Sequence, residues 1–274
     1  MNLLSVPTAI VSALAVTVGA AGALGAVGPG PDARSPAAAV SASAPLGQLL
    51  ARVDELHRRR DDRAAFTEEQ TLVQAALARA PQDFEVLWRA ARVDFWLSDD
   101  PGQSRDERSR VGKLGWDLAE RAIAASPGRV EGHYWAAVCM GNYALGLGVV
   151  RALAQGMEGK FRERLGRAEQ LDRGYQQGAI DTAWGRFYDK LPWPKRDREE
   201  AERHFKRAVE VNNFNLRARV YLASSYLDED RAADAKRLLD EVAAAPGDRY
   251  DGPEERRAKA IGVGLMPRVA AKLR

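Results

Sequence analysis

Apolar residues recur every three or four positions from Leu46 to the end of the chain, a spacing typical of amphipathic helices. Proline, glycine and aspartate interrupt this pattern at intervals and mark where helices end. No segment alternates with a period of two over a useful length, so no sheet is expected. The pattern predicts helices over residues 46–60, 67–80, 83–97, 105–125, 130–154, 161–171, 179–190, 198–211, 216–227, 232–244 and 253–273.

The last predicted helix pairs repeat one another. A motif of small and large apolar residues recurs with an offset of 34 residues at every position, which is the period of the tetratricopeptide repeat (TPR). Small residues in this motif let paired helices approach closely, and the large ones fill the space between pairs. Two helix pairs that match the repeat less closely precede these two copies. The two copies are Ala201-x3-Phe205-x2-Ala208 and Ala235-x3-Leu239-x2-Val242.

This repeat predicts an all-α fold over residues 45–274, in which TPR-like helical hairpins stack into a right-handed superhelix with a concave groove. The first helix of each pair is expected to line that groove. The side chains that line the groove are candidates for ligand or partner binding. The alternative is a structural role, in core packing or in surface ion pairs, and the sequence leaves both interpretations open. The candidate groove residues are Arg89, Trp96, Met140, Asn142, Tyr143, Arg186 and Ser224.

The segment from Gly132 to Val150 has no Asp, Glu, Lys or Arg. We interpret it as a buried central helix, with a membrane span as the alternative. Its apolar surface with the single amide of Asn142 would suit a hydrophobic ligand with one polar anchor. Arg89 and Arg186 are placed to pair with a carboxylate.

The first part of the chain has a different composition. Residues 1–31 contain no charged side chain, and a run of small residues follows that ends in Ala42-Ser43-Ala44, which resembles a signal-peptidase site. We therefore predict a signal peptide or membrane anchor over residues 1–44 and an exported protein, periplasmic or associated with the envelope. Cleavage and retention as an anchor are both open, because the apolar stretch is long enough to span a bilayer. No cysteine follows it, so a lipoprotein anchor at this site is not expected.

Charge and reactive residues argue against catalysis. The chain has 41 Lys and Arg against 38 Asp and Glu, spread along the sequence, so no nucleic-acid surface is expected. A single cysteine, Cys139, excludes a disulfide framework and a multi-thiolate metal site. No metal, cofactor or catalytic residue is predicted. The basic run 57–60 and the pair Asp99-Asp100 are expected to be solvated. An enzyme would require His133, His204 and a carboxylate to converge.

Three further stretches of sequence form a recognisable set: His133-Tyr134-Trp135-Ala136-Ala137, Trp184-Gly185-Arg186-x-Tyr188 with Leu191-Pro192-Trp193-Pro194, and Glu200-Ala201-x2-His204-Phe205-x2-Ala208. Through these stretches, residues 133–248 resemble the T component associated with tripartite ATP-independent periplasmic (TRAP) transporters. The resemblance implies a non-enzymatic, TPR-like periplasmic protein that binds the transporter's solute-binding subunit, or a small hydrophobic ligand, within a helical pore. The alternative is a generic TPR adaptor in an envelope complex. Membrane contact is expected only through the N-terminal segment, and homo-oligomerisation is left open.

Overall fold

The computed structural model of the protein describes residues 43–274, and the predicted signal or anchor segment lies outside this part except for its last two residues. The described residues contain twelve helices and no strand, which confirms the predicted all-α class. The helices are α1 (Leu46–His57), α2 (Arg63–Arg79), α3 (Phe84–Ser98), α4 (Arg105–Ala125), α5 (Val130–Leu147), α6 (Val149–Ala154), α7 (Met157–Leu171), α8 (Ala179–Lys190), α9 (Arg198–Val211), α10 (Leu216–Asp228), α11 (Ala232–Ala244) and α12 (Gly252–Lys272).

Several predicted boundaries were wrong: the first helix ends at His57 and not at residue 60, and α7 begins at Met157 and not at residue 161. Two further errors have an identifiable reason. The helix expected over residues 130–154 is two helices, because Gly148 adopts a φ of 99°, outside the helical range. The helix expected from residue 67 begins at Arg63, because the Asp62 side chain accepts a hydrogen bond from the backbone N–H of Ala65 at 2.8 Å and caps the helix.

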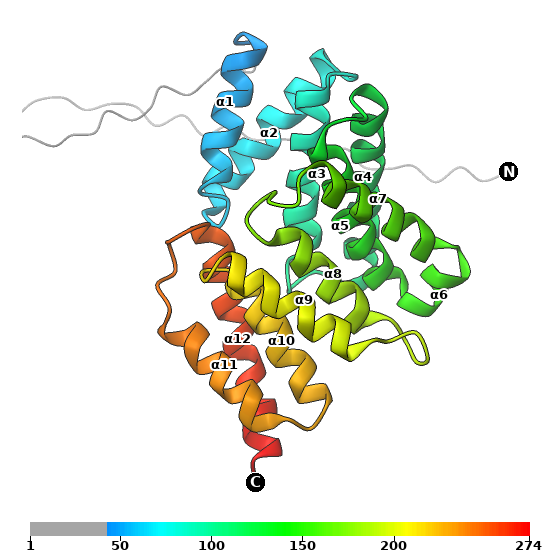
Figure 1. The fold of residues 1–274 in the computed structure, drawn as a ribbon. Helices are drawn as coiled ribbons and strands as arrows, with labels where there is room; N and C mark the ends of the chain where they lie inside the picture. Colours follow the sequence, from blue (N-terminus) through cyan, green and yellow to red (C-terminus); the bar gives the residue numbers. More distant parts are fainter. Residues whose placement is uncertain (1–42) are drawn as a thin grey trace, which may run out of the picture. The chain divides into compact units, whose positions relative to one another are not determined.

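Consecutive helices pack against one another as hairpins, notably α3 on α4, α8 on α9 and α10 on α11 (Figure 1). Glycines let some of these pairs approach closely. A Cβ at Gly112 of α4 would lie 2.6 Å from the backbone N of Tyr143 in α5. A Cβ at Gly185 of α8 would lie 2.6 Å from the ring of Phe205, which is fully buried in α9. The predicted close approach of helices at small residues is therefore present.

The start of α12 returns to the N-terminal helices (Figure 1). Arg60, just after α1, donates to the Asp251 carboxylate at 2.7 Å, and Asp251 is the N-cap of α12. Arg256 pairs with Asp61 at 2.5 Å, and Arg257 donates to the Trp96 carbonyl at 2.9 Å. These contacts join segments more than 150 residues apart, so the first and last parts of residues 43–274 contact one another.

Among the helices of residues 43–274, none is both long enough and apolar enough to cross a membrane. The charge-free segment from Gly132 to Val150 forms α5 and the beginning of α6. Its side chains include Trp135, Ala136 and Met140, which are buried in the central core with helices α7 and α8. This placement agrees with a buried central helix.

Candidate ligand cavity

A cavity of about 610 Å³ lies between α3, α5, α7, α8, α10 and the start of α12. Its volume falls within the usual range for small-molecule sites. Two parts of its lining differ in chemistry. We call the first the apolar wall, formed by Trp135, Val138, Leu145, Met157, Phe161 and Phe187, and the second the ionic end, formed by Asp99, Arg217, Tyr221 and Glu254.

The apolar wall is a continuous set of aromatic and aliphatic side chains from α5, α7 and α8. The rings of Phe161 and Phe187 stack with centroids 4.6 Å apart and planes 5° apart. Trp184 packs edge-on against both of them. Phe161 and Trp184 are themselves buried in the central core, so the wall is an inner surface of that core. A ligand lying along it would exchange water for dispersion contacts.

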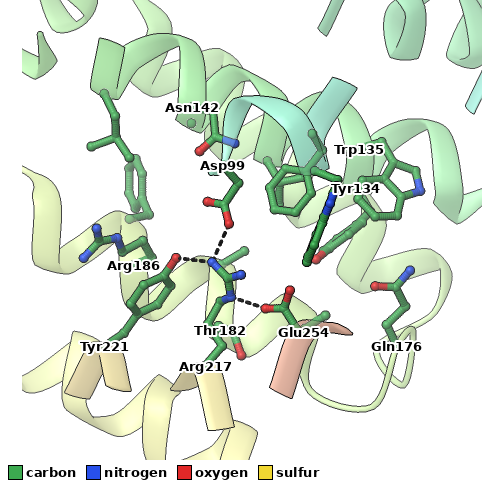
Figure 2. Close-up of a pocket in the computed structure, with 18 of the residues that line it drawn as sticks. Asp99, Tyr134, Trp135, Asn142, Gln176, Thr182, Arg186, Arg217, Tyr221 and Glu254 are labelled. Carbon is green, nitrogen blue, oxygen red and sulfur yellow. Dashed lines mark hydrogen bonds and ion pairs between the residues drawn. The ribbon is translucent and has the colours of Figure 1, made fainter. Parts of the chain in front are cut away.

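The ionic end centres on the guanidinium of Arg217 in α10 (Figure 2). Its Nη1 donates to Asp99 Oδ2 at 2.6 Å and to the Tyr221 hydroxyl at 2.8 Å, and its Nε pairs with Glu254 at the start of α12. Arg217 and Asp99 are each 8% exposed. One guanidinium therefore links three helical segments that are distant in sequence.

Charge compensation stabilises the ionized forms at this end. Burial by itself lowers the pKa of Arg217, but attraction to Asp99 and Glu254 outweighs it and raises that pKa well above the usual value. Burial likewise opposes ionization of Glu254, and Arg217 reverses this and lowers the pKa of the carboxyl group. Because each carboxylate already has a cationic partner, the ionic end serves to join helices.

A second polar group, which we call the cationic corner, consists of Arg186, Lys190 and Asp189 of α8. Lys190 lies 2.8 Å and Arg186 3.4 Å from the same Asp189 carboxylate, which is 1% exposed. The Arg186 guanidinium also lies over the Tyr221 ring, 4.2 Å from its centroid. Burial and the neighbouring Arg186 lower the pKa of Lys190. Two cations share one carboxylate here, which leaves an excess positive charge beside the apolar wall.

The predicted groove residues divide into two sets. Trp96, Met140, Asn142 and Arg186 line the cavity, and the Asn142 amide donates to Ser98 Oγ at 3.0 Å. The other three are not part of the cavity lining. Arg89 pairs with Asp54 at 2.7 Å, Tyr143 packs on Trp116 with centroids 6.0 Å apart, and Ser224 is half-buried in α10. The binding role of all seven stays a prediction.

The sequence analysis did not predict that Asp99 and Arg60 line the cavity. Asp99 was expected to be solvated, and the buried ion pair with Arg217 shows that this was wrong. Arg60 was also expected to be solvated and is 6% exposed, with its guanidinium 4.4 Å from the Trp96 ring centroid. No local pattern marks either residue, because their partners Arg217 and Asp251 lie more than 100 positions away.

The histidines each have their own partner. His204 Nδ1 lies 2.8 Å from Asp181 Oδ1, and its ring stacks on Tyr188. His133 Nε2 lies 2.9 Å from the Pro127 carbonyl, so the two histidines do not share a carboxylate. Burial raises the pKa of the Cys139 thiol well above its usual value, which disfavours the reactive thiolate. Within residues 43–274, no group of three or more His, Cys, Asp or Glu residues is arranged to hold a metal ion.

The stacked hairpins and their small-to-large packing define an all-α, TPR-like helical protein. Residues 49–177, just under half of the chain, match the family model described as "Regulator of microtubule dynamics protein 1-3". The fold is similar to that of a thermophilic TPR protein of Thermus thermophilus, with 19% identity, a TM-score of 0.58, and coverage of 84% of this chain and 99% of the other.

A structure of PilF from Pseudomonas aeruginosa is a more distant match, with 15% identity, a TM-score of 0.46, and coverage of 81% of this chain and 92% of the other. No curated protein matches the sequence.

Proposed function

We propose that this chain is a non-enzymatic, exported binding protein whose central cavity takes a small hydrophobic ligand with an acidic group. The observation that carries the proposal is the excess positive charge of Arg186 and Lys190 beside the apolar wall. The resemblance to TRAP transporter T components and the charge-free N-terminal stretch support a role beside a periplasmic solute uptake system.

The geometry assigns a different task to each part of the cavity. The apolar part of the ligand lies along Phe161 and Phe187, where burial of apolar area contributes about 25 cal/mol per Å². Its acidic group pairs with Arg186 and Lys190 and completes the charge compensation that Asp189 provides only in part. Because the site is partly buried, this pairing is stronger than it would be in bulk water.

The test compares a long-chain carboxylic acid with the alcohol of equal length, by displacement of a fluorescent fatty acid from the purified full chain. We expect the acid to bind about tenfold more tightly than the alcohol, and the double variant Arg186→Met, Lys190→Met to abolish that difference. The matched control is Lys236→Met, Arg237→Met, which removes two exposed cations from α11. Equal binding of acid and alcohol to the natural protein would contradict the proposal.

A protein adaptor is the second candidate, and the observation in its favour is apolar surface outside the cavity. Val263 of α12 is 69% exposed and Leu114 of α4 is 47% exposed. An adaptor would use such a surface or the groove for an envelope protein such as a solute-binding subunit. Native mass spectrometry of the full chain separates the two candidate functions. A small molecule that co-purifies with the chain supports ligand binding in the cavity. An empty chain that forms a complex only with a purified solute-binding subunit supports the adaptor function.

A further inference from the structure

Two segments beside the cavity expose large apolar side chains. Trp193, in the loop between α8 and α9, is 89% exposed, and Val150 of α6 is 71% exposed. Solvent exposure of nearly an entire tryptophan is unusual for a side chain of this size. Because neither residue belongs to a core cluster, packing within the described chain does not account for them.

These two segments belong to one surface. Lys195 Nζ lies 2.5 Å from Glu158 Oε2 in the first turn of α7, which ties the loop after α8 to the helix that follows α6. Leu153 of α6 and Leu191 at the start of the loop both line the cavity. Figure 1 shows α6 and this loop on the same side of the molecule. We call residues 149–160 and 190–196 the cavity rim.

The cavity rim is strongly basic. It contains five cations and a single acidic residue, and because Asp189 pairs with Lys190 at 2.8 Å, a formal excess of three positive charges remains. Its acidic residue, Glu158, is already paired with Lys195 and Arg162. An anionic partner is therefore the complement of this surface. The five cations are Arg151, Lys160, Lys190, Lys195 and Arg196.

We propose that the cavity rim docks on the surface of an anionic lipid bilayer. The amphipathic ring of Trp193 lies at the level of the headgroups, where tryptophan is preferred, and Val150 adds apolar contact. The surrounding cations are attracted to anionic lipids. Docking in this orientation turns the cavity lining toward the bilayer, which gives an apolar ligand a short path between membrane and cavity. This second membrane contact goes beyond the one expected from the N-terminal segment.

The test uses the full chain with vesicles of phosphatidylcholine alone or mixed with phosphatidylglycerol, each containing brominated lipid that quenches nearby tryptophan. With anionic vesicles we expect quenching that Trp193→Phe abolishes. The variant Lys195→Glu, Arg196→Glu should reduce this quenching at least tenfold at a fixed lipid concentration, and the control Lys236→Glu, Arg237→Glu on α11 should not. The N-terminal segment is the same in every variant, so differences among them report on the rim.

Quenching that is equal in Trp193→Phe and the natural protein, or equal with neutral and anionic vesicles, would overturn the proposal. So would an absence of quenching combined with Trp193-dependent binding to a purified protein partner, which would assign the rim to that partner. The cavity is tested separately, because the fatty-acid displacement titration contains no vesicles. Failure of the rim proposal would leave that titration unchanged.

Discussion

The apolar wall and the ionic end line the same cavity but are built in different ways. The wall consists of side chains from α5, α7 and α8, which follow each other closely in the chain, and each contributes volume and contact area. The ionic end depends on Arg217, which holds Asp99 at the end of α3 and Glu254 at the start of α12. The wall is therefore expected to respond gradually to substitution, whereas the ionic end is expected to fail when Arg217 is removed.

The largest effect is expected from Arg217→Met. This change leaves the buried carboxylate of Asp99 and that of Glu254 without their main cation, which costs about 3–5 kcal/mol of unfolding free energy. Urea unfolding followed by circular dichroism measures the loss. Arg237→Met, an exposed arginine on α11, is the matched control and should cost less than about 0.5 kcal/mol. A loss below about 1 kcal/mol for Arg217→Met would mean that water compensates the carboxylates.

A smaller and graded effect is expected in the apolar wall. Phe161→Ala removes a ring that stacks on Phe187 and should cost about 3 kcal/mol, since the surrounding helices fill the new space only in part. Phe161→Leu keeps most of the volume and should cost about 1 kcal/mol. The same urea measurement applies to both. If Phe161→Leu lowered the unfolding free energy as much as Phe161→Ala, contact area would not determine how much the apolar wall contributes to stability.

Asp94 of α3 sharpens the contrast between the two parts because it is a half-buried carboxyl group with only weak charge compensation. Burial raises its pKa to about 7, and the charge of Arg110 opposes this only in part. Between the unfolded pKa and about pH 7, the folded chain retains a proton that the unfolded chain has lost, so the unfolding free energy falls as pH rises through that window.

Asp94→Asn removes this dependence. At about pH 8 the variant should exceed the natural protein in unfolding free energy by about 4 kcal/mol, and the two should be nearly equal at about pH 4. The measurement is urea unfolding across this pH range, with Asp117→Asn on the exposed side of α4 as the control. Parallel pH profiles for Asp94→Asn and the natural protein would show that Asp94 is ionized throughout.

The smallest effect is expected from Tyr221→Phe. The variant loses the hydroxyl that accepts a 2.8 Å hydrogen bond from Arg217 but keeps the ring beneath Arg186. Because Asp99 and Glu254 still hold Arg217, we expect a loss of about 1 kcal/mol in the urea measurement. A loss as large as that of Arg217→Met would show that Tyr221 is an essential member of the ionic end.

The difference between the apolar wall, built from neighbouring helices, and the ionic end, built from distant ones, also explains how far the sequence could predict this structure. Helix positions follow from local periodicity, and the 34-residue offset predicted small residues where paired helices approach closely, as Gly185 of α8 does against Phe205 of α9. The apolar character of α5 was also visible. The partners of Asp99 were not, because an ion pair between residues 118 positions apart depends on how all the intervening hairpins stack. Of the cavity residues, Arg186 was found through its register in the repeat, whereas Arg217 was not.

The return of α12 to the first helices has a consequence for how the chain folds. In an open array of repeats each unit contacts only its neighbours, so the ends can unfold independently. Here the pairs Arg60–Asp251 and Arg256–Asp61 connect residues 191 and 195 positions apart. Such contacts form only after nearly the whole chain has been ordered, which slows folding. During synthesis the cavity is thus completed last, when α12 is made and closes the array.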